Sequence, residues 1–144
     1  MEPLGGKRHV AITERRTRKD WAMQIKQMLD ERYLDAIKVR LVMDNLNTHS
    51  ITSLYETFPP EEARRLAERL DIHYTPKHTS WLNMAEIEIG ILDRQCTGRR
   101  IGDHARLCSE VLAWEQRRNQ ECRRIEWKFN RQEADEKLSR HYVS

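Results

Sequence analysis

The sequence lacks any run of about 18 or more apolar residues, and it shows no signal-peptide pattern. Nothing in it therefore indicates a membrane span or export. Its cysteines, Cys96, Cys108 and Cys122, are odd in number and lack CxxC spacing. This pattern argues against a disulfide framework and against a structural zinc site. We expect a cytoplasmic protein whose thiols are reduced.

Neither sign of charge is in large excess either. The chain has 26 Lys and Arg residues and 23 Asp and Glu residues, which gives a net charge of +3. A mean hydropathy of -0.86 marks a polar chain, but its apolar residues are clustered, which is compatible with folding. Its 144 residues are enough for one domain. Arginine is dense in the ranges 15–18, 99–100 and 117–124. Such clusters suit phosphate backbones, or they are solvated helix faces paired with Glu, and composition leaves both interpretations open.

Strands and helices are expected to alternate along the chain, which predicts an α/β fold. The strands are expected at 8–13, 39–43 and 72–75. The second of these is a short apolar run that we predict to be buried on both faces. The helices are expected at 17–33, 51–58, 61–70, 82–96, 103–120 and 132–141.

Two of these helices carry recognisable N-caps. Thr17 is followed three residues later by Asp20, in the position of a capping box. Asp103 is expected to cap the helix that follows it. The inner side of that helix is predicted to hold Leu107, Val111, Leu112 and Trp114.

Asp44 comes directly after the apolar strand at 39–43. The carboxyl ends of strands in α/β sheets are where ligands collect, so Asp44 is a candidate site residue. Taken alone, Asp44 has a second, less favoured interpretation, in which it caps a turn. His49, His73 and His78 suggest zinc, but their spacings are irregular and no cysteine lies close in sequence, which argues against that metal.

Glu86 lies in the expected helix at 82–96, where we predict it to be wedged between two apolar faces. A buried carboxylate is costly unless it is paired or binds a metal. Glu88 is roughly 200° around the helix from Glu86, so the two cannot easily share one metal. We expect Glu88 to be solvated or salt-bridged. Magnesium prefers oxygen ligands and usually takes one or two carboxylates, and two-metal nucleases use such acids.

The loop before this helix contains a cation, an imidazole and an indole, in Lys77, His78 and Trp81. These groups could hold a DNA backbone and stack on a base. Alternatively, Trp81 packs the loop onto the core. Arg117 and Arg118, in the arginine-rich helix, are further candidates for contact with DNA.

Two motifs together carry a resemblance to a known family. Met43-Asp44-Asn45 with Asn47-Thr48-His49 resembles the second catalytic aspartate of the DDE transposases of the IS630/Tc1/mariner superfamily, specifically the bacterial IS630-like branch. Leu82-Asn83-Met84-Ala85-Glu86 is similar to the Leu-Asn-Pro-Ile-Glu motif of that family, with Met-Ala in place of Pro-Ile. The resemblance assigns the third acid to Glu86 and extends along nearly the whole chain.

The resemblance implies an RNase H-like fold in which Asp44 and Glu86 are catalytic and bind Mg²⁺, with Mn²⁺ as a possible substitute. Family members bind transposon terminal inverted repeats, cut the DNA and join the 3′-OH ends into target DNA, typically at TA. The implied partners are DNA and other transposase polypeptides. The implied location is the bacterial cytoplasm, with nucleoid association when the protein is bound to DNA.

The resemblance also implies that parts are missing. The family needs a first aspartate on the first strand and an upstream helix-turn-helix region, and this chain starts too late to hold either. We expect residues 1–144 to form a partial catalytic domain, with strands 3, 4 and 5 and flanking helices but without the first strand. Its core is expected at about 1–100 and a C-terminal helical extension at about 101–144.

Three hypotheses about function follow. The first is a C-terminal fragment of an IS630-family transposase, inactive alone and completed by a homo-oligomer or by an upstream polypeptide. The second is a non-catalytic truncated protein that binds DNA or full-length transposase and dampens transposition. The third is a cytosolic α/β domain whose acids merely cap turns, which the motif contexts of Asp44 and Glu86 disfavour.

Overall fold

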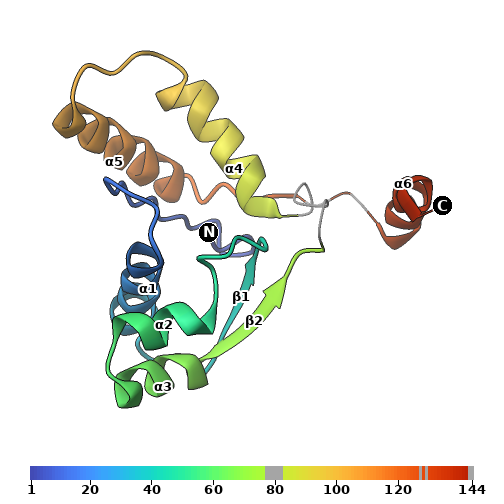
Figure 1. Ribbon diagram of the computed structural model, residues 1–144. Helices are drawn as coiled ribbons and strands as arrows, with labels where there is room; N and C mark the ends of the chain where they lie inside the picture. Colours follow the sequence, from blue (N-terminus) through green and yellow to red (C-terminus); the bar gives the residue numbers. More distant parts are fainter. Residues whose placement is uncertain (77–82, 127, 129, 143–144) are drawn as a thin grey trace.

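The computed structural model describes residues 1–76, 83–126, 128 and 130–142. Its strands are β1 (Val39–Met43) and β2 (Leu70–Tyr74), and π-helical turns η1 (Met28–Arg32) and η3 (Asp93–Thr97) extend two of the helices. The helices are α1 (Arg18–Gln27), α2 (Ile51–Thr57), α3 (Pro60–Glu68), α4 (Met84–Leu92), α5 (His104–Gln120) and α6 (Arg131–Tyr142). This mixture of helices with a small parallel sheet confirms the predicted α/β class (Figure 1).

The sheet of the described residues has two strands, which run parallel with Val39 opposite Leu70 and Met43 opposite Tyr74. The prediction of a strand at 8–13 is wrong. In that segment the backbone N–H of Arg8 donates to Asn119 Oδ1 at 2.8 Å. The backbone N–H of Val10 donates to Glu115 Oε2 at 2.6 Å. Side chains of α5 thus bind backbone groups that a neighbouring strand would otherwise have used.

Strand β1 is covered on one face, and the prediction that both faces are buried is wrong. Val39 and Leu41 pack against the core cluster formed by the first three helices. Val42 points the opposite way, as alternation along a strand requires, and is 53% exposed. Figure 1 shows α1, α2 and α3 gathered at one side of the two strands. Covering only one side of the sheet leaves the other side open at β1.

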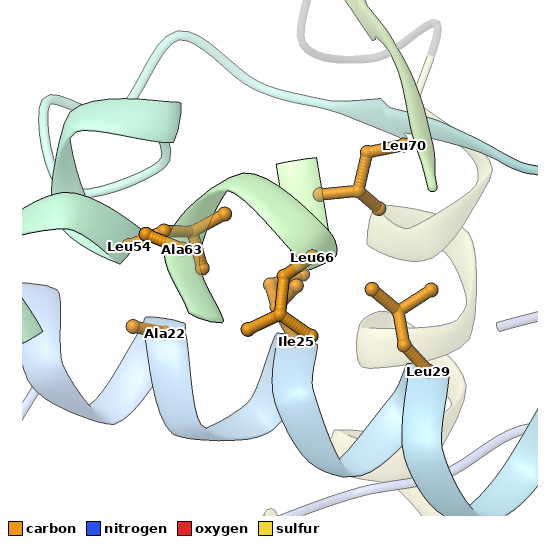
Figure 2. Close-up of a cluster of buried hydrophobic side chains, with 7 residues drawn as sticks. All are labelled: Ala22, Ile25, Leu29, Leu54, Ala63, Leu66 and Leu70. Atoms are coloured by element: carbon orange, nitrogen blue, oxygen red, sulfur yellow. The ribbon is translucent and has the colours of Figure 1, made fainter. Parts of the chain in front are cut away.

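The main core lies between these three helices and the start of β2 (Figure 2). Along α1 and η1 the buried residues Ala22, Ile25 and Leu29 recur at intervals of three and four, so they form one apolar face. The capping box predicted at Thr17 and Asp20 is confirmed and sets where α1 begins. Figure 2 shows the seven buried side chains facing one another: Ala22, Ile25, Leu29, Leu54, Ala63, Leu66 and Leu70.

A second cluster joins α4 and η3 to α5, which caps on Asp103 as predicted. Its buried members are Cys96, Val111 and Trp114. The prediction that Leu112 faces inward is wrong, because its side chain is 54% exposed. Leu112 is displaced by about 100° around the helix from the buried Val111, which turns its side chain away from the second cluster. Helix α6 stands apart from the other helices in Figure 1. None of the helices in the described ranges combines the length and hydropathy needed to cross a membrane.

Candidate metal and DNA site

Asp44 directly follows β1, at the end where both parallel strands finish. The two strand ends are tied together beside it. The backbone N–H of Thr75 donates to the Met43 carbonyl at 2.9 Å, and the Asn45 side-chain amide donates to the Thr75 carbonyl. The side chain of Asp44 is 42% exposed. The sheet therefore holds the backbone of this acid firmly while its carboxylate stays accessible to a ligand.

The loop after Asp44 folds back so that His49 meets it. His49 Nδ1 lies 2.7 Å from Asp44 Oδ1. The Trp21 indole stacks on the imidazole, with ring centroids 6.0 Å apart and planes inclined by 28°. The Tyr74 hydroxyl donates to the His49 carbonyl at 2.8 Å. From the sequence, His49 is considered as a zinc ligand and as part of the motif that carries the family resemblance, and no role beside Asp44 is assigned to it. The short spacing from Asp44 was the one available signal, and the contacts with Trp21 and Tyr74 depend on the fold.

Glu86 lies in the first turn of α4, which Asn83 caps by accepting a hydrogen bond from the Ala85 backbone N–H at 3.0 Å. This end of α4 meets β1 at a pocket of about 260 Å³. The pocket is lined by Met1, Pro3, Arg40, Leu41, Val42, Asn83, Met84 and Ala85. Glu86 follows one of these residues directly, and Asp44 comes two residues after Val42. Asp44 thus follows, and Glu86 lies on, elements that meet at one pocket, and neither acid is among the lining residues.

The burial of the two glutamates of α4 is opposite to the prediction. Glu86 is exposed, so the expectation that it is wedged between apolar faces is wrong. Glu88 is the buried one, at 5% exposure. Its Oε1 lies 3.0 Å from Arg8 Nε and 2.8 Å from Arg118 Nη2. Glu88 is therefore salt-bridged, as expected, but by arginines that are distant in sequence. An exposed Glu86 remains free to bind a ligand.

The chemistry of the donors fits a hard divalent cation. Asp44 and Glu86 offer carboxylate oxygens, and Mg²⁺ typically takes one or two of these together with water and substrate phosphate. Over the described ranges no group of three or more His, Cys, Asp or Glu residues is placed to hold a metal ion. Two carboxylates alone are a partial ligand set for such an ion, whose other positions are filled by water or substrate oxygens.

The candidate DNA contacts divide into three kinds. Lys77, His78 and Trp81 lie outside the described residues. Arg118 is held by Glu88, and its guanidinium lies 5.6 Å from the centroid of the Trp114 ring. Arg117 is exposed. Both arginines border a hollow of about 430 Å³ at the end of α5, lined by Gln95, Arg117, Arg118, Glu121 and Arg123. Arg117 is the better placed of the two to meet a phosphate.

Ligands of α/β proteins collect at the carboxyl ends of the strands, where Asp44 lies, and divalent metal ions held by protein ligands cut phosphodiesters in nucleases. The model of the DDE superfamily endonuclease family matches residues 1–108 of the 144-residue chain, which therefore belongs to this family. Such endonucleases generally use divalent metal ions and act on DNA. No curated protein and no solved structure matches the chain.

Proposed function

We propose that this chain provides two metal-binding acids, Asp44 and Glu86, to an IS630-type transposase that cleaves and rejoins DNA at transposon ends. The observation that supports the proposal best is the meeting of β1 and α4 at one pocket, with the two acids close to it in sequence and exposed to solvent. The parallel pairing of β1 with β2 is compatible with the RNase H-like fold that the resemblance implies.

The residues have separate tasks in this proposal. Asp44 presents its carboxylate from the end of the sheet, and Glu86 presents its own from the first turn of α4. These two carboxylates would hold Mg²⁺ or Mn²⁺, which would supply positive charge to activate a water or 3′-hydroxyl nucleophile and to stabilise the leaving oxygen. The N-terminus of α4 adds a favourable partial positive charge for acidic groups in its first turn.

We extend the proposal to the partners. The family site is built from three acids, and this chain contributes two, so a further carboxylate is needed for cleavage. We propose that it comes from a second polypeptide, either another copy in a homo-oligomer or an upstream transposase polypeptide. The isolated chain would then be inactive.

Metal binding by the full chain tests the proposal without relying on cleavage. Mn²⁺ is titrated into the protein and free Mn²⁺ is measured by electron paramagnetic resonance. We expect Asp44→Asn and Glu86→Gln each to reduce binding by more than about tenfold, because each removes a charged ligand. Asp35→Asn and Glu68→Gln are matched controls, since both change exposed acids elsewhere and should bind Mn²⁺ like wild type. Equal Mn²⁺ binding by wild type and all four variants would contradict the assignment of Asp44 and Glu86 as metal ligands.

Nicking of supercoiled plasmid DNA in Mn²⁺ tests the chemistry of the assembled enzyme. Asp44→Asn or Glu86→Gln should abolish nicking by the assembly while DNA binding in a gel shift survives. Full nicking by either variant contradicts the proposed roles. If the wild-type chain alone nicks DNA in a way that needs both acids, the proposal of a second polypeptide is wrong and the site assignment stands.

A further inference from the structure

We propose that His49 is a positioning residue that fixes the carboxylate of Asp44 for metal binding. The inference rests on the proposed function, because orientation of this carboxylate matters only if Asp44 is a metal ligand. Its basis is the 2.7 Å contact between His49 Nδ1 and Asp44 Oδ1, together with the two groups that hold His49 itself.

The contact divides the two oxygens of Asp44 between two tasks. A hydrogen bond from His49 Nδ1–H to Oδ1 sets the rotation of the carboxylate about its last bond. In the part of the chain that the structure describes, Oδ2 has no hydrogen-bond partner. Oδ2 is therefore the oxygen left for a metal ion. Ligating carboxylates are commonly held in this way by hydrogen bonds from neighbouring groups, which orient them and tune their affinity.

Asp44 needs such a partner because of where it lies. It is the first residue after β1, outside the strand itself, and its side chain is 42% exposed. An exposed carboxylate in a loop samples several orientations, and binding in one of them costs conformational entropy. A hydrogen bond that already selects the orientation lowers this cost before the metal arrives.

His49 is a suitable partner because it is itself immobilised on two sides. The Trp21 indole covers one face of the ring, and Tyr74 hydrogen-bonds the His49 main chain. The backbone N–H of His49 also donates to the Leu46 carbonyl at 2.8 Å, which closes the loop. The imidazole is only 27% exposed. Contacts from α1, from the loop after Asp44 and from β2 together fix the position of His49 Nδ1.

Two substitutions separate the hydrogen bond from the packing. His49→Phe keeps an aromatic ring for Trp21 and removes the donor. His49→Asn removes the ring and keeps an amide N–H near the place of Nδ1. We expect Mn²⁺ affinity of the full chain to fall about tenfold in His49→Phe and to stay within about threefold of wild type in His49→Asn. A purely structural role predicts the reverse order, because His49→Asn loses the stacking. That reverse order would overturn the proposal.

The tautomer of His49 gives a second readout that needs no metal. Long-range ¹H–¹⁵N correlation spectra of the wild-type chain, recorded under mildly alkaline conditions, should show the proton of a neutral ring on Nδ1. In Asp44→Asn this preference should weaken, because the anionic acceptor is gone. A wild-type ring that carries its proton on Nε2 would overturn the proposal, whatever the metal titrations show.

The outcomes also separate this inference from the function on which it rests. If wild type binds no Mn²⁺, or binds it equally with Asp44→Asn, the metal-ligand role of Asp44 fails and the positioning role fails with it. If Asp44→Asn abolishes binding while His49→Phe binds like wild type, the proposed function stands and only the positioning role is overturned.

Discussion

Arg118 binds the buried carboxylate of Glu88 through two N–H groups, with Nε 2.9 Å from Oε1 and Nη2 3.2 Å from Oε2. Arg8 approaches the same carboxylate from the N-terminal segment, and its side chain is only 1% exposed. Burial lowers the pKa of Arg8, and the nearby Glu88 charge opposes that shift. The other N–H groups of Arg8 donate to the carbonyls of Gly6, Arg118 and Arg123. One carboxylate thus links the N-terminal segment to α4 and α5.

Glu88→Gln should destabilise the protein by about 3 kcal/mol. The substitution removes the negative charge that compensates two arginines in a largely buried place, and breaking such a pair typically costs about 3–5 kcal/mol. Urea unfolding followed by circular dichroism measures the change. Glu86→Gln is the matched control, on the same helix but exposed, and should shift stability by less than about 0.5 kcal/mol. Equal stability of the two variants would contradict the structural role of Glu88.

The free energy of unfolding should fall between about pH 5 and pH 2 because of the ion network that Asp30 and Glu62 form with Arg65. Hydrogen bonds from Arg65 lower the pKa of Asp30 to about 2 and the pKa of Glu62 to about 2. Since both folded pKa values lie below the usual ones, the stabilisation is present above about pH 4 and is lost as the pH falls through about 2. Partial exposure screens the network, so we expect a loss on the order of 1–2 kcal/mol for the pair.

Urea midpoints measured at a series of pH values provide the check on this acid dependence. The double variant Asp30→Asn/Glu62→Gln removes both titrating groups and serves as its control. We expect the double variant to be less stable at neutral pH and to lose less stability on acidification than wild type. If the urea midpoint of wild type changed with pH as steeply as that of the double variant, the network of Asp30, Glu62 and Arg65 would not be the source of the acid dependence.

Leu66→Ala should cost about 3 kcal/mol, because Leu66 is fully buried at the centre of the main core and its truncation leaves a cavity. Leu112→Ala is the matched comparison. The spacing of α5 predicts that Leu112 faces inward, whereas its side chain is 54% exposed. Its truncation should change the free energy of unfolding by less than about 0.5 kcal/mol. Similar losses in both variants would mean that α5 is rotated from the position described.

Arg117→Gln should weaken DNA binding and lower the slope of log affinity against log salt by about 1, since one phosphate contact is lost. Arg117 is exposed beside the basic hollow at the end of α5. Arg64→Gln, an exposed arginine on α3, is the charge-matched control and should leave the slope unchanged. Fluorescence anisotropy with a duplex at several salt concentrations measures both. Identical slopes for the two variants would exclude Arg117 as a contact.

The local features were open to prediction because they depend on neighbours within a few residues. Thr17 with Asp20 forms the predicted capping box, and Asp103 caps α5 as expected. The bounds of β1 match the apolar run at 39–43, which places Asp44 at a strand end. The motifs around Asp44 and Glu86 were sufficient to indicate a protein of the DDE superfamily, whose endonuclease model matches residues 1–108.

What the sequence could not determine was which side chains other parts of the chain would cover. Helical periodicity placed Glu86 between apolar faces and predicted that Glu88 is solvated or salt-bridged, but it could not show that Arg8 and Arg118 would bury Glu88. The segment at 8–13 has β propensity, but α5 offers acceptors for its backbone N–H groups, so it does not become a strand. By itself, the sequence determined the caps at Thr17 and Asp103 and the bounds of β1, and it indicated Asp44 and Glu86 as candidate site residues. The tertiary structure decided their burial and partners, because these depend on groups that are remote along the chain and adjacent only after folding.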